Sequence, residues 1–403
     1  MPQRRIILTF AVLSALFASG YGVMFTVLDD FRDKYGIPED QLGLVVAIGF
    51  FSSFIAQVFI APLADKGFAK RLVYLGLLFN VAGLLAMAFG TSLGVIVLGR
   101  LVMGIGAGIA GPAIRRIVIL ADPDHLGDNI GRLLSADVAG FALGPAISAV
   151  LVGPFGLAAP FLVIAALSVL CVPLVARVHV TETAVEDQHE SRFAFDMLRS
   201  RPFVGALLLG AAVFVMIGTF DSMWVLVLDD LKSPVWIANI GITIFALPLV
   251  FLGSIGGRLA QRVGPFRLGL CGLLFGSLCM FLYGQMPTAL AMFAVSMCHA
   301  VNDGFTISST GVAIGVVSPP ERQAGAQGLL GGVQTLTGGL TAVVASSLYK
   351  NHGRAVAYTA SALLIVALAI LGAACAGRGW LRKPSSPAII GEPVGQLAKS
   401  FVD

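Results

Sequence analysis

The chain has 403 residues, of which 57% are hydrophobic and only 12% are charged, and its formal net charge is +4. Soluble domains carry about a quarter charged residues, so this composition excludes an ordinary soluble protein and indicates an integral membrane protein. The basic residues are scattered between apolar runs and form no stripe, which argues against a nucleic-acid partner.

Twelve apolar runs are long enough to cross a membrane, since a bilayer core about 30 Å thick needs roughly 20 apolar residues per helix. In chain order the predicted spans are 6–28, 41–63, 71–90, 94–118, 132–153, 157–177, 203–228, 235–257, 267–284, 288–316, 325–349 and 355–377. We therefore predict an all-α integral membrane protein with twelve transmembrane helices.

Lys and Arg are enriched in the short cytoplasmic loops of membrane proteins, which orients the spans. If the N-terminus is cytoplasmic, the segments on that side carry twenty Lys and Arg residues and those on the other side carry five. We expect a multi-pass protein of the plasma membrane with both termini in the cytoplasm. Neither an enzyme nor a cofactor or metal site is expected, because no nucleophile motif, metal-ligand spacing or phosphate loop lies outside the spans.

The charged segment 179–201 is the longest interior gap and separates six spans from six. We predict an N-terminal bundle over 1–178, a cytoplasmic linker over 179–201, a C-terminal bundle over 202–378 and a cytoplasmic tail over 379–403. The tail contains Pro, Ser and Gly without a long apolar run, so we expect it to be disordered. Within the linker, Phe193, Phe195 and Leu198 are expected to form a short interfacial helix.

The two halves repeat one another. "YGVMFTVLDDF" at 21–31 corresponds to "DSMWVLVLDDL" at 221–231, which makes Tyr21 the symmetry mate of Asp221. "APLADKGFAKR" at 61–71 aligns in the same way with "GRLAQRVGPFR" at 257–267. Each half has an even number of spans, so the repeats run in parallel about an axis along the membrane normal. The substrate route is then expected between the halves.

The loop after the second span resembles the signature of the major facilitator superfamily, and the likeness covers nearly the whole chain. The first copy matches the signature at Asp65, Lys66, Lys70 and Arg71. The second copy keeps Arg262 and Arg267, while Gln261 replaces the acid. The resemblance implies two six-helix bundles that alternate access to a shared cavity, and a clasp at this loop that holds the inner side closed. A solvated turn is the alternative interpretation.

Two further spans resemble motifs of the same superfamily. Span 94–118 carries Arg100 ahead of a glycine-rich face, and span 132–153 carries Gly140, Gly144 and Pro145. The second pattern is similar to the helix-five signature of proton-driven exporters, and the chain is closest in motif pattern to the twelve-helix drug:proton antiporters. Small residues four apart also let helices approach closely and Pro favours a kink, so ordinary packing is the alternative.

One glycine motif is expected to have no binding role. "GAGIAG" at 106–111 has the spacing of a dinucleotide fingerprint, but that fingerprint requires a preceding strand and a water-accessible helix start. These glycines lie inside an apolar span, so we expect them to pack against a neighbouring helix.

Ionisable residues within spans are costly and usually face a cavity, a partner or an ion path. The candidates are Arg100, Asp137, Asp221, His299 and Asp303. His299, Asn302 and Asp303 are spaced i, i+3 and i+4, which places all three on one helical face. The resemblance implies that the first, fourth, seventh and tenth spans line the cavity, and these hold every candidate except Asp137.

Low dielectric favours the neutral form of a carboxyl group, which can then load and release a proton. We expect Asp303 or Asp221 to carry the proton and Arg100 to modulate its charge state or to bind substrate. Structural roles are the alternatives: an Asp303 bonded to neighbouring helices, an Asp221 that caps an interface, and an Arg100 in a polar network. Asp137 is expected to pair with Arg115, Arg116 or the Asp65 loop.

The favoured interpretation is a secondary transporter for a small organic solute, with proton-coupled efflux of amphiphilic or drug-like compounds. Two acids and one Arg in the cavity should favour cationic or neutral amphiphiles over multivalent anions. A proton symporter or facilitator for a sugar or organic acid is the first alternative, and a non-transporting receptor or scaffold is the second. The expected partners are the substrate, protons and the lipid bilayer, and the family precedent implies a monomer.

Overall fold

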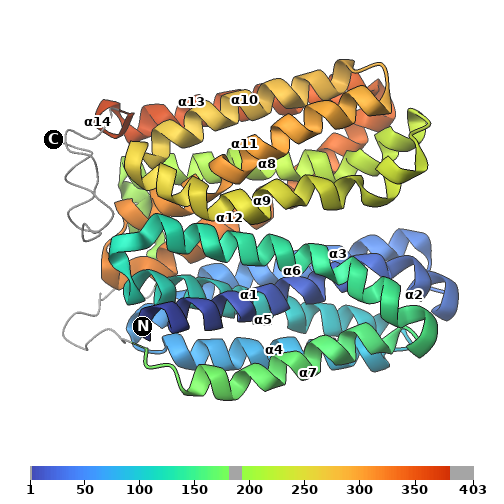
Figure 1. Ribbon diagram of the computed structural model, residues 1–403, viewed down its shortest axis with the longest axis horizontal. Coiled ribbons are helices and arrows are strands. Elements are labelled where there is room, and N and C mark those ends of the chain that lie inside the picture. Colours follow the sequence, from blue (N-terminus) through green and yellow to red (C-terminus); the bar gives the residue numbers. More distant parts are fainter. Residues whose placement is uncertain (1, 181–192, 382–403) are drawn as a thin grey trace. The chain divides into compact units, whose positions relative to one another are not determined.

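The computed structural model describes residues 2–180 and 193–381, and within these residues the chain forms helices and no strands. Twelve stretches of helix are long and apolar enough to cross a membrane, which confirms the predicted number of spans. Figure 1 shows the long helices of each part running side by side. The predicted tail lies outside the described residues except for residues 379–381, as do linker residues 181–192.

The helices before the linker follow the predicted order, with ends that extend beyond several of the predicted spans. They are α1 (Pro2–Thr26), α2 (Leu28–Tyr35), α3 (Glu39–Phe59), η1 (Ala61–Lys66), α4 (Ala69–Phe89), α5 (Leu93–Ala121), η2 (Pro123–His125), α6 (Leu126–Phe155) and α7 (Ala158–Ala176). The longer ends arise because charged residues can continue a helix beyond the hydrocarbon core.

The later helices have the same arrangement of long spans joined by short connections. They are η4 (Ala194–Arg199), α8 (Arg201–Asp230), α9 (Val235–Val263), α10 (Pro265–Gln285), α11 (Ala289–Val317), η5 (Pro320–Arg322), α12 (Gln323–His352), α13 (Arg354–Ala376) and α14 (Arg378–Leu381). The expected interfacial helix is the single 3-10 segment η4, in which Phe195 and Leu198 are exposed.

The repeated "VLDD" sequence has a different structure in each half. In the first half α1 ends at Thr26, and Leu28 begins the separate helix α2, which ends before Gly36 in the left-handed conformation. In the second half the same letters complete α8 without a break. The difference follows from the residues after the repeat, because only the first copy continues with a polar helical segment of its own.

Two compact units divide the described chain, and each unit takes the start of one helix from the other half of the sequence. Of the described residues, unit 1 contains 2–122, 136–180, 193–194 and 321–332, and unit 2 contains 123–135, 195–320 and 333–381. The first turns of α12 therefore pack with α3 and η1, and the first turns of α6 pack with α9. The positions of the candidate gating residues depend on this exchange.

Small residues let neighbouring helices come close, which is the main packing device available in lipid. A Cβ on Gly106 would lie 2.7 Å from the Gly76 carbonyl oxygen, so α4 and α5 touch through their backbones at this point. Gly106 belongs to the "GAGIAG" sequence, and its position inside a helix confirms that the sequence has a packing role. Large apolar side chains such as Phe51, Phe155 and Phe251 are exposed, as expected for surfaces that face lipid.

Candidate functional site

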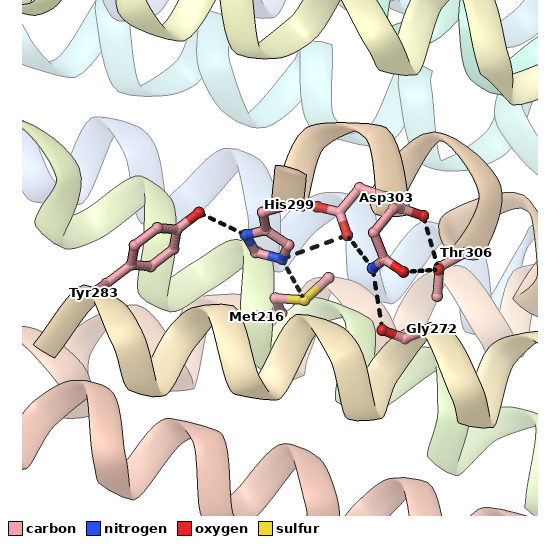
Figure 2. Close-up of polar contacts among 7 residues, drawn as sticks. Met216, Gly272, Tyr283, His299, Asp303 and Thr306 are labelled. Carbon is pink, nitrogen blue, oxygen red and sulfur yellow. Dashed lines mark hydrogen bonds and ion pairs between the residues drawn. The ribbon is translucent and has the colours of Figure 1, made fainter. Parts of the chain in front are cut away.

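A polar network of unit 2 surrounds Asp303, near the middle of α11 (Figure 2). Asp303 is 3% exposed and His299 is 1% exposed. Asp303 Oδ1 lies 3.5 Å from His299 Nε2, one helical turn away, and 3.5 Å from Asn302 Nδ2. The structure therefore brings together the three residues that the sequence placed on one face.

Neighbouring helices complete this network with groups that the sequence analysis did not place beside His299. Tyr283 Oη of α10 lies 2.8 Å from His299 Nδ1, and Met216 Sδ of α8 lies 3.0 Å from His299 Nε2. Asn302 Nδ2 donates to the Gly272 carbonyl oxygen at 3.0 Å. Each side of the imidazole thus has a partner, which holds the ring in one orientation. Tyr283 was not among the predicted site residues because those were chosen as charged residues within spans, and a phenol is neutral at ordinary pH.

Aromatic side chains enclose the imidazole and keep water away from it. Phe220 stacks on Phe245 and on Trp224, with ring centroids 4.6 Å apart in both pairs. The Phe245 ring lies 6.0 Å from that of His299. These rings form an apolar wall beside the His299 end of the network.

Arg100 is the corresponding feature of unit 1, and it is fully buried on α5. Its Cζ atom lies 3.9 Å from the centre of the Tyr21 ring and 5.9 Å from the centre of the Phe50 ring. None of its three guanidinium nitrogens makes a hydrogen bond to the described residues. A buried ion costs several kcal/mol of desolvation, while a cation–π contact returns about 2 kcal/mol, so the charge is under-compensated.

The remaining predicted cavity residues are split between the two units. Asp221 is exposed on α8 in unit 2, and Tyr21 is half-buried on α1 in unit 1. One cluster, around Arg100, thus belongs to unit 1, and the other, around Asp303, belongs to unit 2. Asp137 bonds to Ser14 and lies 3.7 Å from Arg115, which confirms the expected pairing with a neighbouring Arg.

Asp65 in η1 is the centre of the predicted gating loop. Its carboxylate accepts from Arg116 Nε at 3.1 Å, from the Ala324 backbone N–H at 2.9 Å and from the Gly325 backbone N–H at 2.7 Å. Ala324 and Gly325 belong to the first turn of α12, where backbone donors and the helix dipole favour a negative charge. Asp65 and Arg116 are both buried, so Asp65 makes a buried, charge-assisted contact with the start of α12 and the loop is not a solvated turn.

Gln261 occupies the corresponding place in unit 2 and makes the corresponding contacts without charge. Its Oε1 atom accepts from the Gly127 backbone N–H at 2.8 Å, at the start of α6, and its Nε2 donates to the Asp124 carbonyl oxygen at 2.9 Å. The negative charge near this contact belongs to Asp128, in the first turn of α6. Its Oδ2 atom lies 2.6 Å from Arg132 Nη2, and its Oδ1 atom lies 3.8 Å from Arg258 Nη1. The sequence repeat predicted the position of Gln261, while the role of Asp128 was missed.

The cations of the loop signature have varied surroundings. Lys70 Nζ donates to the carbonyl oxygens of Ala176 and Val178 at 2.9 and 2.7 Å, which satisfies the C-terminal end of α7. The Arg71 guanidinium lies 5.5 Å from the centre of the Phe68 ring. Lys66 is half-buried, and Arg262 and Arg267 are exposed.

The helix-five motif brings α6 against α1. A Cβ on Gly144 would lie 2.5 Å from the Gly22 carbonyl carbon and from the Val23 nitrogen, and one on Gly140 would overlap the Ala15 carbonyl group. Pro145 lies within α6, which continues through it to Phe155. The motif therefore has the close packing that its alternative interpretation predicts.

Replacing Gly144 by Ala is expected to lower the stability of the protein by about 1–3 kcal/mol, because the new methyl group meets backbone atoms that cannot turn away. The thermal unfolding temperature of the purified protein in detergent would report this loss. Gly153→Ala in the same helix is the matched control, since a Cβ there meets nothing within 4 Å. Equal unfolding temperatures for the two variants would contradict the packing role.

Comparisons with sequences of known proteins agree with this architecture. The profile of the Major Facilitator Superfamily matches residues 9–238 and 222–401. The quinolone resistance protein NorA of Staphylococcus aureus (strain MRSA252) is 30% identical over 129 residues, covering 32% of this chain and 33% of NorA. The chain thus spans about a third of the length of NorA in this match. Multidrug resistance protein 2 of Bacillus subtilis (strain 168) is 24% identical over 311 residues, covering 71% of this chain and 74% of the relative.

Solved structures show the same fold at low sequence identity. The human organic anion transporter MFSD10 has a TM-score of 0.76 at 17% identity, covering 92% of this chain and 100% of that chain. The transporter FucP has a TM-score of 0.74 at 16% identity, covering 92% of this chain and 98% of that chain. With its family profile matched over most of its length and its twelve spans present, the chain belongs to the Major Facilitator Superfamily of membrane transporters.

Proposed function

We propose that the protein exports amphiphilic, drug-like compounds across the plasma membrane in exchange for protons, with both termini in the cytoplasm. The observation that carries the proposal is the buried network around Asp303, in which a carboxyl group, an imidazole and a phenol are linked inside one unit. Such a network suits a group that gains and loses a proton during transport. The names of the NorA and Bacillus relatives refer to drug resistance, which supports the same direction of transport.

Asp303 is the proposed proton carrier, and His299 controls its surroundings. When Tyr283 donates its O–H to His299 Nδ1, the imidazole carries its proton on Nε2 and presents an N–H to the Asp303 carboxylate. When Tyr283 accepts instead, Nε2 becomes an acceptor for a protonated Asp303. The pair can therefore satisfy both protonation states of the carboxyl group without moving the helices. Asp221, exposed on α8, is the second candidate carrier of the same bundle.

Symport of a sugar or organic acid is the second candidate function. The specific observation in its favour is the fold likeness to FucP and to the proton:xylose symporter XylE, the latter with a TM-score of 0.76 at 12% identity. Both functions use the same fold, so the direction of coupling separates them.

The test uses the purified full-length protein in liposomes with ethidium as a cationic amphiphile and xylose as the sugar probe. An antiporter accumulates ethidium in liposomes with an acidic interior, because each proton that leaves drives a dye molecule inward. A symporter accumulates xylose only when the interior is alkaline. Ethidium uptake that depends on an acidic interior is the expected result, and uptake that ignores the proton gradient would contradict the proposal.

A further inference from the structure

The guanidinium of Arg100 is buried on α5 with a charge that the surrounding protein does not balance. The acids within the other spans of unit 1 are Asp65 and Asp137, and both already have partners, Arg116 and Arg115 respectively. The three guanidinium nitrogens of Arg100 make no hydrogen bond to the described residues. Five donors in a planar fork are therefore held ready inside the membrane for an anion that the unit itself does not supply.

The surroundings of Arg100 indicate how an anion would reach it. On the side of α3 the guanidinium rests against Gly49, where a Cβ would lie 2.5 Å from Arg100 Cζ and Nε, so backbone closes this direction. Tyr21 and Phe50 cover the guanidinium with their rings, and both side chains are half-buried rather than buried. Their ring centroids are 6.3 Å apart. Rotation of one ring would expose the guanidinium while the other ring stays beside it.

We propose that Arg100, Tyr21 and Phe50 form a binding site for the carboxylate of a flat, amphiphilic monoanion or zwitterion. A carboxylate matches the planar guanidinium with two parallel hydrogen bonds, and an aromatic body replaces the covering ring in the stack. A single guanidinium cannot balance the charge of a multivalent anion, so phosphate monoesters are disfavoured. The inference rests on the proposed transport function and adds amphiphiles that carry a carboxylate to its substrates, beside cations such as ethidium.

The site is tested by equilibrium binding to the full-length protein in detergent, with 2-naphthoate and 2-naphthamide as probes of equal shape and different charge. The wild-type protein is expected to bind naphthoate at least about tenfold more tightly than the amide, since tenfold is the smallest ratio that one charge-assisted contact should give. Arg100→Gln is expected to lose this preference. Arg100→Lys keeps the charge without the planar fork and should retain only part of it.

A second variant and a control test the same site if Arg100→Gln folds poorly. Gly49→Ala leaves every charge in place but pushes the guanidinium aside, and it should weaken naphthoate binding while leaving naphthamide binding unchanged. Arg354→Gln is the control, because the Arg354 guanidinium donates to the Met286 carbonyl oxygen at 2.7 Å in the other unit. It should bind naphthoate like the wild type.

Equal binding of the two probes to the wild type, or naphthoate binding that persists in both Arg100→Gln and Gly49→Ala, would overturn the site. These measurements need no proton gradient, so their outcome is independent of the liposome assay. Failure of proton coupling with intact charge preference would contradict the proposed function alone, and the converse result would contradict this site alone.

Discussion

Asp303→Asn is expected to abolish proton-driven accumulation of substrate while leaving exchange of substrate across the liposome membrane intact. The amide keeps the size of the side chain and can still accept from Asn302, but it has no proton to release. Loss of a group that transfers a proton typically costs on the order of 100-fold or more in rate. Ethidium accumulation driven by an acidic interior measures the first property, and counterflow between preloaded dye and labelled dye measures the second.

Tyr283→Phe is the graded variant for the same network. It removes the hydroxyl group at His299 Nδ1 without changing the shape of the ring, so it should shift the pH dependence of transport rather than abolish transport. Tyr358→Phe is the matched control, because Tyr358 is buried with its ring 5.6 Å from Tyr283 and its hydroxyl makes no hydrogen bond to the described residues. Full proton-driven accumulation by Asp303→Asn would rule out Asp303 as the carrier and leave Asp221 to be tested in the same assay.

Periodicity explains why part of this network was predictable. Residues four apart on a helix face the same way in any environment, so the grouping of His299 with Asp303 needed only the sequence and the span. Tyr283 and Met216 lie on other helices, and their contact depends on how α8, α10 and α11 rotate against one another. The sequence carries no local signal for that rotation, because these spans are apolar around most of their circumference.

In the gating loop, too, the sequence predicted the local features but not the contacts between helices. The composition predicted twelve spans, and the repeat aligned Gln261 with Asp65. They did not predict that the first turns of α12 join unit 1 and the first turns of α6 join unit 2. The start of each of these helices is held in the other unit by its backbone N–H groups, which donate to Asp65 and Gln261. Every helix start has such free N–H groups, so they carry no sequence signal. Which start meets which loop therefore depends on tertiary packing.

Asp65→Ala is expected to lower the stability of the protein more than Gln261→Ala does. It leaves the buried Arg116 guanidinium without its carboxylate, and the N–H groups of Ala324 and Gly325 lose an acceptor. Removing one partner of a buried ion pair typically costs about 3–5 kcal/mol. Thermal unfolding of the purified protein in detergent measures the loss, and the double variant Asp65→Ala with Arg116→Gln should recover part of it.

Gln261→Ala provides the comparison that isolates the charge. It removes an acceptor from the Gly127 N–H at the equivalent place in unit 2, but it leaves no buried ion unpaired, so a loss of about 1–3 kcal/mol is expected. If the two single variants lose equal stability, the Asp65 carboxylate contributes only a hydrogen bond. A larger loss for Asp65→Ala that shrinks when Arg116 is also neutralised indicates a charged clasp in one repeat and a neutral one in the other. In that case the loop contacts of the two repeats differ in strength, because the Asp65 contact carries a charge and the Gln261 contact does not.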